Sequence, residues 1–198
     1  QAGTSTNMNS QLMALIGQVS GGVSEGCYPV INRCNIFLEN YATLSDADKK
    51  KMEGRRGEIL FLRTYAYFIL SNTFGAVPIM TKSVSGMPEN FYYPKGTLEE
   101  LYTMLINDMK EAVEILPATT GDLGRITKPA AATFLAKLFL VRAQGAEFQN
   151  SSEPTLKALY KGTDSEDLDN AIKYATVAIS QKQNETAYGG LAPDFGSL

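Results

Sequence analysis

Residues 57–80, GEILFLRTYAYFILSNTFGAVPIM, carry the strongest hydrophobic pattern in this chain. Positions 59–70 are apolar on nearly every side, and a helix of that kind belongs in the middle of a packed bundle. Gly75 and Pro78 mark where such a helix ends, because Gly tolerates positive φ and Pro cannot continue the hydrogen-bond ladder. The pattern therefore predicts a buried helix that stops at Phe74.

The chain before this segment divides into a polar part and a periodic part. Residues 1–26 are rich in Ser, Asn, Gly and Thr, with one short apolar stretch at 12–19. Pro29 suits the first position of a helix, because its missing N–H is not needed there. Apolar side chains then recur at i, i+3, i+4 and i+7, which predicts an amphipathic helix. These side chains are Val30, Ile31, Cys34, Phe37, Leu38 and Tyr41.

Capping signals predict where the apolar helix begins, and turn residues predict a loop after it. Ser45 and Asp48 have the spacing of a helix cap. Gly54 and Gly57 are points where the helix could kink or restart. Several Gly and Pro residues in 75–96 predict a loop.

The second half of the chain repeats the helical pattern. Thr97 and Glu100 form a capping box before an amphipathic helix that Pro117 ends. Residues 130–141 are again apolar nearly all round. A last helix is expected at 168–180. One side of it is lined by Ala171, Ile172, Ala175, Ala178 and Ile179.

These segments amount to five or six helices in antiparallel pairs, with no convincing strand. Small residues at helical spacing on two of the helices allow backbones to approach closely. The predicted fold class is therefore all-α, a tetratricopeptide-like helical repeat bundle. We expect a polar N-terminal segment at 1–26, the helical domain at 27–181 and an irregular tail at 182–198.

Composition narrows the function classes. The net charge is −3 and 20% of residues are charged, so nothing suggests nucleic acid or an anionic membrane surface. The chain has no histidine, which excludes histidine-based triads and histidine metal sites. No apolar run approaches the roughly 18 residues of a transmembrane helix. The chain begins at Gln1 without Met, and we expect that a leader or a preceding segment has been removed.

Two other features have competing interpretations. Cys27 and Cys34 lie two helical turns apart, about 10 Å, which is too far for a disulfide. Apolar packing is expected of them, against a reactive or metal-binding thiol. The acidic run 164–169 superficially suggests calcium, but the alternating ligands and glycine of an EF-hand are missing. A helix N-terminus explains these acids better.

The order of residues in 57–78 also resembles the signature of the SusD/RagB family, roughly G-E-x-x-F-L-R-A-x-x-Y-F-x-L-x-x-x-F-G-x-V-P. Thr64 stands where Ala is usual. The positions that match include Arg63, Phe74, Gly75 and Pro78. Further stretches resemble other family segments in the right order, and together they cover roughly 27–181. They are 28–40, 102–117, 124–140 and 171–179.

The resemblance implies a surface lipoprotein of the Gram-negative outer membrane, lipid-anchored in its full-length form. Such proteins cap a TonB-dependent, SusC-like transporter and capture oligosaccharides or polysaccharides, sometimes peptides. They are not enzymes and need no catalytic cofactor. Because family chains are much longer, residues 1–198 are expected to be a fragment whose partners include the remaining C-terminal part. The alternative function is a tetratricopeptide-type protein–protein adaptor with no carbohydrate role.

The candidate ligand residues are the aromatic cluster Phe91, Tyr92 and Tyr93, with Asn90 beside it. Sugars pack their C–H faces on aromatic rings, and their hydroxyls need polar partners. The other interpretation is that these rings anchor the loop to neighbouring helices, since exposed apolar clusters are normally covered. Arg63 sits within an apolar helix, where a charge must be paired. A structural tie to a carboxylate or to helix-end carbonyls is expected, with a ligand role as the alternative.

Overall fold

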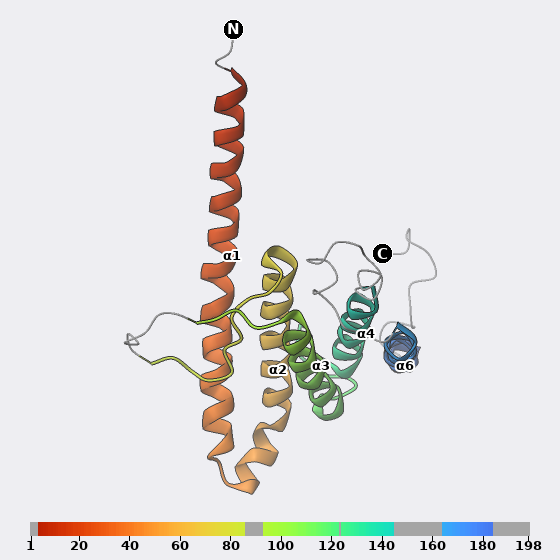
Figure 1. The fold of residues 1–198 in the computed structure, drawn as a ribbon. Helices are drawn as coiled ribbons and strands as arrows, with labels where there is room; N and C mark the ends of the chain where they lie inside the picture. The colour runs from red at the N-terminus through yellow and green to blue at the C-terminus, as the bar shows by residue number, and fades with distance from the viewer. Residues whose placement is uncertain (1–3, 86–92, 123, 145–163, 184–198) are drawn as a thin grey trace.

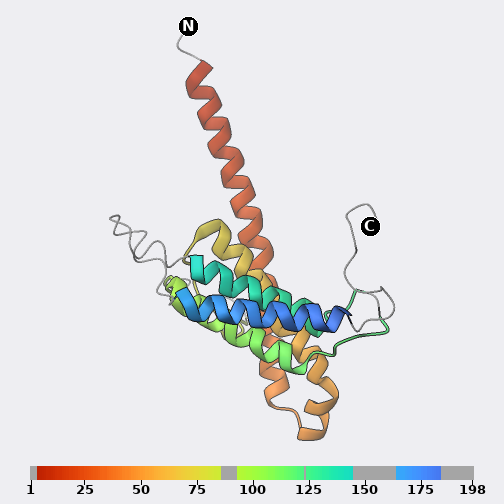
Figure 2. The same cartoon turned by 90° about the vertical axis from the view of Figure 1, so that its right-hand side faces the viewer.

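The computed structural model describes residues 4–85, 93–122, 124–144 and 164–183. Within these ranges the regular structure is entirely helical, and each helix packs on the next described one, α1 on α2 through to α4 on α6. Figures 1 and 2 show the helices stacked side by side, as the predicted all-α repeat arrangement requires. The helices are α1 (Thr4–Ala42), α2 (Asp46–Phe74), α3 (Leu98–Ile115), α4 (Lys128–Gln144) and α6 (Asp164–Gln183).

Helix α1 corrects the prediction made from Pro29. The helix starts at Thr4, so Pro29 lies in its interior and the expected division at residue 26 falls inside a continuous helix. Pro29 is exposed, as is Glu25 one turn earlier. Water can therefore satisfy the carbonyl of Glu25, which loses its helical partner to the proline. Figure 1 shows the N-terminal half of α1 projecting beyond the end of α2.

Helix α2 begins and ends where the capping signals predict. The Asp48 N–H donates to the Ser45 hydroxyl at 3.3 Å. At the other end the Gly75 N–H donates to the Ser71 carbonyl at 2.9 Å, and Gly75 has φ of 70°. The two glycines inside the helix do not interrupt it, because α2 is continuous from Asp46 to Phe74.

The predicted capping box of α3 is present. The Thr97 N–H donates to the Glu100 carboxylate at 2.8 Å, and the Glu100 N–H donates to the Thr97 hydroxyl at 3.1 Å. Two backbone N–H groups that have no partner inside the helix are thus satisfied.

The buried face of α6 agrees with the predicted one only in part. Ile172 and Ile179 are 65% and 43% exposed, although the apolar pattern placed them on the packed side. Ala171 and Ala178 are buried as predicted, but Asp167 and Tyr174 are buried with them, so the buried face is rotated toward these two side chains. The rotation follows from side chains that pair with α4. Asp167 accepts two hydrogen bonds from Arg142, at 2.7 and 2.6 Å, and the Tyr174 ring stacks on Phe139.

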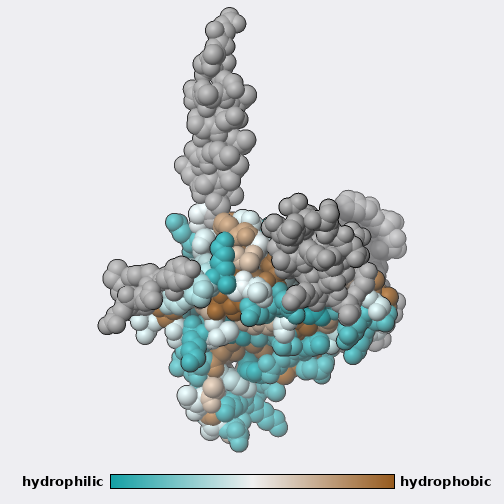
Figure 3. All heavy atoms as spheres, viewed as in Figure 1, coloured by the Kyte–Doolittle hydropathy of each residue, from teal (hydrophilic) through white to brown (hydrophobic). Residues whose placement is uncertain are grey.

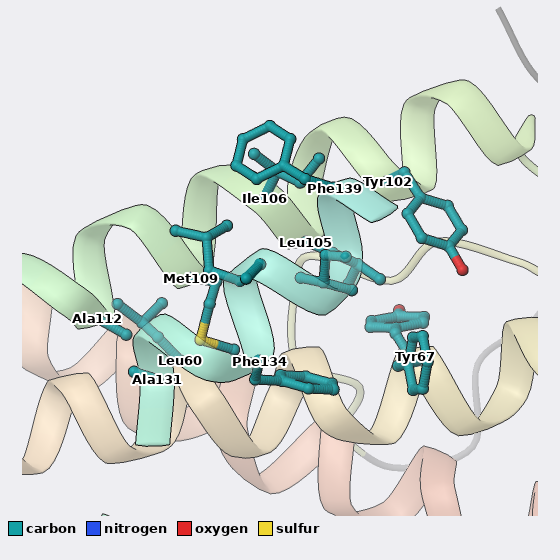
Figure 4. Close-up of a cluster of buried hydrophobic side chains, with 14 of the residues drawn as sticks. Leu60, Tyr67, Tyr102, Leu105, Ile106, Met109, Ala112, Ala131, Phe134 and Phe139 are labelled. Carbon is teal, nitrogen blue, oxygen red and sulfur yellow. The ribbon is translucent and has the colours of Figure 1, made fainter. Parts of the chain in front are cut away.

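The core lies between α2, α3 and α4, and Figure 4 shows side chains from all three meeting there. Cys27 and Cys34 are free and buried on α1, as predicted. Burial raises the pKa of both thiols, which fits apolar packing. The fully buried large side chains include Tyr67, Leu70, Tyr102, Leu105, Met109, Leu135 and Phe139.

One charged side chain, Arg63, lies inside this packing at 8% exposure. Its Nε and Nη2 atoms each donate to the Asp108 carboxylate at 2.8 Å. Its Nη1 atom donates to the Asn35 amide oxygen at 2.9 Å. The predicted tie to a carboxylate is thus confirmed, and it joins α2 to both α3 and α1. Burial raises the pKa of Asp108, and the adjacent guanidinium opposes that rise.

Two glycines on α2 offer a matched test of the packing. A Cβ atom at Gly57 would lie 2.8 Å from Cγ of Leu116, whereas one at Gly54 would meet nothing within 4 Å. Gly57→Ala should lower the free energy of unfolding by about 1–3 kcal/mol through overpacking. Gly54→Ala should raise it by about 0.5–1 kcal/mol, because Ala favours helix. Urea unfolding measures both, and equal stabilisation by the two changes would contradict the close approach of α2 and α3.

Removing the buried charge tests the tie between the helices. Arg63→Ala should destabilise the fold by about 3–5 kcal/mol, because it leaves Asp108 buried without its cation. Arg55→Ala is the control, since Arg55 is exposed and makes only a 3.4 Å surface pair with Glu58. Its effect should stay within about 0.5 kcal/mol. Similar thermal midpoints for the two variants would show that the buried pair does not organise the helices.

Candidate functional site

A groove of about 680 Å³ opens where α1, the end of α2 and the following loop meet. Figure 3 shows hydrophobic surface at this junction, where the projecting half of α1 leaves the rest of the molecule. The aromatic residues Phe74 and Tyr93 are each 39% exposed. Among the described residues of the lining, Lys95 carries the one charge. The lining includes Tyr28, Leu70, Phe74, Pro78, Tyr93 and Lys95.

Two glycines shape the loop that forms one wall. Gly75 takes a positive φ of 70°, which turns the chain away from the axis of α2. The Gly96 N–H donates to the Val77 carbonyl at 3.1 Å, so the outgoing and returning limbs of the loop lie together. A Cβ atom at Gly96 would lie 2.5 Å from Cδ1 of Ile79. A larger residue at this position would therefore force the Ile79 side chain to shift.

The first limb continues as an irregular segment, residues 78–84, which we call the strap. A polar row on α1 lies along it. The row consists of Tyr28, Asn32, Asn35 and Glu39, and each of the four is hydrogen-bonded to the strap. Pro78 and Met80 of the strap also line the groove. The row on α1 therefore contacts the same segment that forms one groove wall.

Tyr67 fixes the strap from the side of α2. Its hydroxyl accepts the Met80 N–H at 2.6 Å and lies 3.1 Å from the Met80 carbonyl, to which it donates. Burial raises the pKa of Tyr67 to about 12. The hydroxyl therefore keeps its proton at neutral pH and can make both bonds at once.

Of the residues predicted from sequence, Phe74, Pro78 and Tyr93 line the groove together. Gly75 forms the turn beside it, and Arg63 lies in the core rather than in the lining. Phe74 precedes the loop in sequence and Tyr93 lies near its end. The path of the loop brings both residues to the same groove.

Asn90, Phe91 and Tyr92 lie outside the described residues. The two interpretations of the aromatic cluster, a ligand platform or an anchor for the loop, both remain open for them. Tyr93 is the one member of the cluster that is described.

Sequence reasoning missed the row on α1 as part of the site. Tyr28, Asn35 and Glu39 stand in a stretch that resembles the family, but the resemblance gives them no role. The available signal was polar side chains at i, i+4, i+7 and i+11, which share one helix face. That spacing alone does not reveal that a loop about fifty residues away binds there.

The described part of the chain shows neither a metal-binding cluster nor a membrane-spanning helix. It contains no group of three or more Cys, Asp or Glu side chains that could hold a metal ion. No helix in the described ranges combines the length and apolar character needed to cross a membrane. The described lining of the groove supplies apolar surface, the exposed aromatic residues Phe74 and Tyr93, and the positive charge of Lys95.

Comparison with known proteins identifies what the chain is similar to. A SusD-like family described as starch-binding and associating with the outer membrane matches residues 17–140. A SusD-like protein from Bacteroides ovatus is 30% identical over 138 residues, which cover 67% of this chain and 24% of that protein. SusD-like protein P2 from Formosa agariphila is 29% identical over 126 residues, or 64% of this chain and 24% of that protein.

A solved structure with a xylogluco-oligosaccharide agrees with the fold. It has a TM-score of 0.65 and 27% identity, and the match covers 80% of this chain and 29% of that one. The chain thus spans about a quarter of the length of the relatives it matches. The family match follows the order of the helices from α1 into α4, and on this evidence the chain belongs to the SusD-like family.

Proposed function

We propose that this chain is the helical part of a surface glycan-binding subunit that serves a TonB-dependent outer-membrane transporter. Family membership is the observation that carries the proposal, because the family's description combines starch binding with outer-membrane association. The relative solved with a xylogluco-oligosaccharide supports an oligosaccharide or polysaccharide as the ligand.

The groove offers a physical means of contact with a sugar. Phe74 and Tyr93 are exposed rings on which the C–H face of a sugar can pack. The Ser24 hydroxyl and the Lys95 ammonium line the same groove and can meet sugar hydroxyls. Asn90, Phe91 and Tyr92 remain part of the proposed ligand set. The proposed role is capture without catalysis, and the groove residues fit that role because they provide contact surface.

The partners belong to the same proposal. A SusC-like transporter would receive the glycan, and a lipid anchor would hold the full-length protein at the cell surface. In this proposal a further part of the same protein would complete the contact with the sugar.

An exposed apolar face gives some support to the second candidate function, a protein–protein adaptor. Leu168, Ile172 and Ile179 recur on α6 and are all exposed. A helix face of this kind can pack on a partner protein. The gene beside this one discriminates between the functions. A TonB-dependent receptor gene supports glycan import, and a lone operon without one supports the adaptor.

The glycan role predicts weak, localised binding by residues 1–198. Phe74 and Tyr93 cover one side of a sugar, while the entropy cost of ordering it remains. Malto- and xylogluco-oligosaccharides should therefore bind with dissociation constants of about 1 mM. Calorimetry should detect no micromolar binding. In a nuclear magnetic resonance titration, the chemical-shift changes caused by the sugar should be confined to residues of the groove.

A pair of tyrosines provides the control. Tyr93→Ala should abolish the shifts, whereas Tyr65→Ala should preserve them, because Tyr65 is an exposed tyrosine of α2 outside the groove. Shifts that survive Tyr93→Ala would move the sugar site away from the groove. Micromolar binding by a monomer would contradict the idea that this part supplies one side of a shared platform.

A further inference from the structure

The strap needs hydrogen-bond partners that its own conformation does not provide. Residues 78–84 form neither helix nor strand, so their peptide groups have no regular ladder. The row on α1, Tyr28, Asn32, Asn35 and Glu39, supplies partners from one face of a rigid helix.

The first half of the strap is held by two members of the row. The Tyr28 hydroxyl donates to the Pro78 carbonyl at 3.3 Å. The Asn35 amide donates to two carbonyls, those of Met80 at 2.8 Å and Lys82 at 3.1 Å. One asparagine thus fixes two peptide groups of the strap.

The second half is held by the other two members. Asn32 makes a two-bond clamp, accepting the Val84 N–H at 2.7 Å and donating to the Val84 carbonyl at 3.2 Å. Glu39 accepts the Ser83 N–H at 2.7 Å and also the Ser83 hydroxyl. These contacts lower the pKa of Glu39, so its carboxylate stays ionised as an acceptor at neutral pH.

Nearly all of these bonds end on main-chain atoms of the strap, the Ser83 hydroxyl being the exception. The row therefore fixes the path of the strap whatever side chains the strap carries. The side chains of Pro78 and Met80 remain available to line the groove. The residues that fix the path of the strap thus lie on α1, whereas the strap residues Pro78 and Met80 are the ones available to contact a ligand.

We propose that Asn32 and Glu39 are positioning residues for the groove. They hold the strap at Ser83 and Val84, and so fix the far end of the segment whose near end, Pro78 and Met80, presents a wall to a sugar. This inference rests on the proposed glycan role. Neither Asn32 nor Glu39 lines the groove, so both act through the strap. Holding the wall in place before binding removes an ordering cost that the ligand would otherwise meet.

These two residues also permit a clean test. Asn35 is fully buried and bonded to Arg63, so its replacement would disturb the core. Asn32 is only partly buried and Glu39 is exposed. Replacing either should loosen the strap and leave the helices folded.

The first measurement is amide hydrogen exchange in Asn32→Ala and Glu39→Ala. Exchange at Ser83 and Val84 should become about tenfold faster, since each change removes hydrogen bonds to the strap. The thermal midpoint should stay within about 2 °C of the wild type. Asn40→Ala is the matched control, because Asn40 is an exposed neighbour on α1 and should change neither quantity.

The second measurement is the affinity for malto- and xylogluco-oligosaccharides by resonance titration. A positioning role predicts that both affinities fall together, by about three- to tenfold, in Asn32→Ala and Glu39→Ala. Glu39→Gln should recover part of the loss, because its amide oxygen can still accept the Ser83 N–H. Met80→Ala should alter affinity without accelerating exchange at Ser83 and Val84.

Each failure has a distinct meaning. Unchanged exchange at Ser83 and Val84 would overturn the inference, because the row would not hold the strap. Faster exchange with unchanged sugar affinity would also overturn it, and the proposed function would stand on the wild-type binding. A wild-type chain that binds neither sugar at millimolar concentration would overturn the proposed function together with the inference.

Discussion

The buried hydrogen bonds of Arg63 link the packing of the helices to the shape of the groove. A buried guanidinium must be paired, and that of Arg63 donates hydrogen bonds to Asp108 on α3 and to Asn35 on α1. Because the Asn35 oxygen accepts from Arg63, its amide nitrogen must point the other way. It points to the carbonyls of Met80 and Lys82. The core charge therefore sets the orientation of a side chain that fixes the strap.

Removing an exposed ion pair costs much less stability than breaking the Arg63 pair does. Lys51 and Asp48 form an exposed pair within α2, and pairs of this kind contribute about 0–1 kcal/mol. The Arg63 pair is buried, so its loss would leave an uncompensated charge, which costs several times more. Its value lies less in net stability than in the arrangement it imposes on three helices.

The helices could be predicted because their signals are local. The capping residues Ser45 and Thr97 and the turn at Gly75 act within a few positions of themselves. Pro29 misled the prediction because a proline at the first helical turn and one on an exposed helix face look alike in sequence. The buried side of α6 was predicted only in part, because Arg142 and Phe139, on another helix, draw Asp167 and Tyr174 inward.

The site was predictable only in part for the same reason. The sequence singled out Phe74 and Pro78 as motif residues and Tyr93 as a member of an aromatic cluster. It did not show that the three line one groove. The bonds from Asn32, Asn35 and Glu39 to the strap cross 44 to 52 positions of sequence. They pair side chains with main-chain atoms, which carry no residue-specific pattern. A single sequence therefore gives no sign of them.

Native-state hydrogen exchange of the Met80 amide tests most directly whether the core controls the strap. This N–H donates to Tyr67, and the Met80 carbonyl accepts from Asn35, which Arg63 holds. The account predicts that the free energy of opening at the Met80 amide lies within about 1 kcal/mol of that at core amides such as Leu105. It also predicts that both values decrease together as denaturant is added. Exchange at the rate of an exposed loop amide, independent of denaturant, would contradict it.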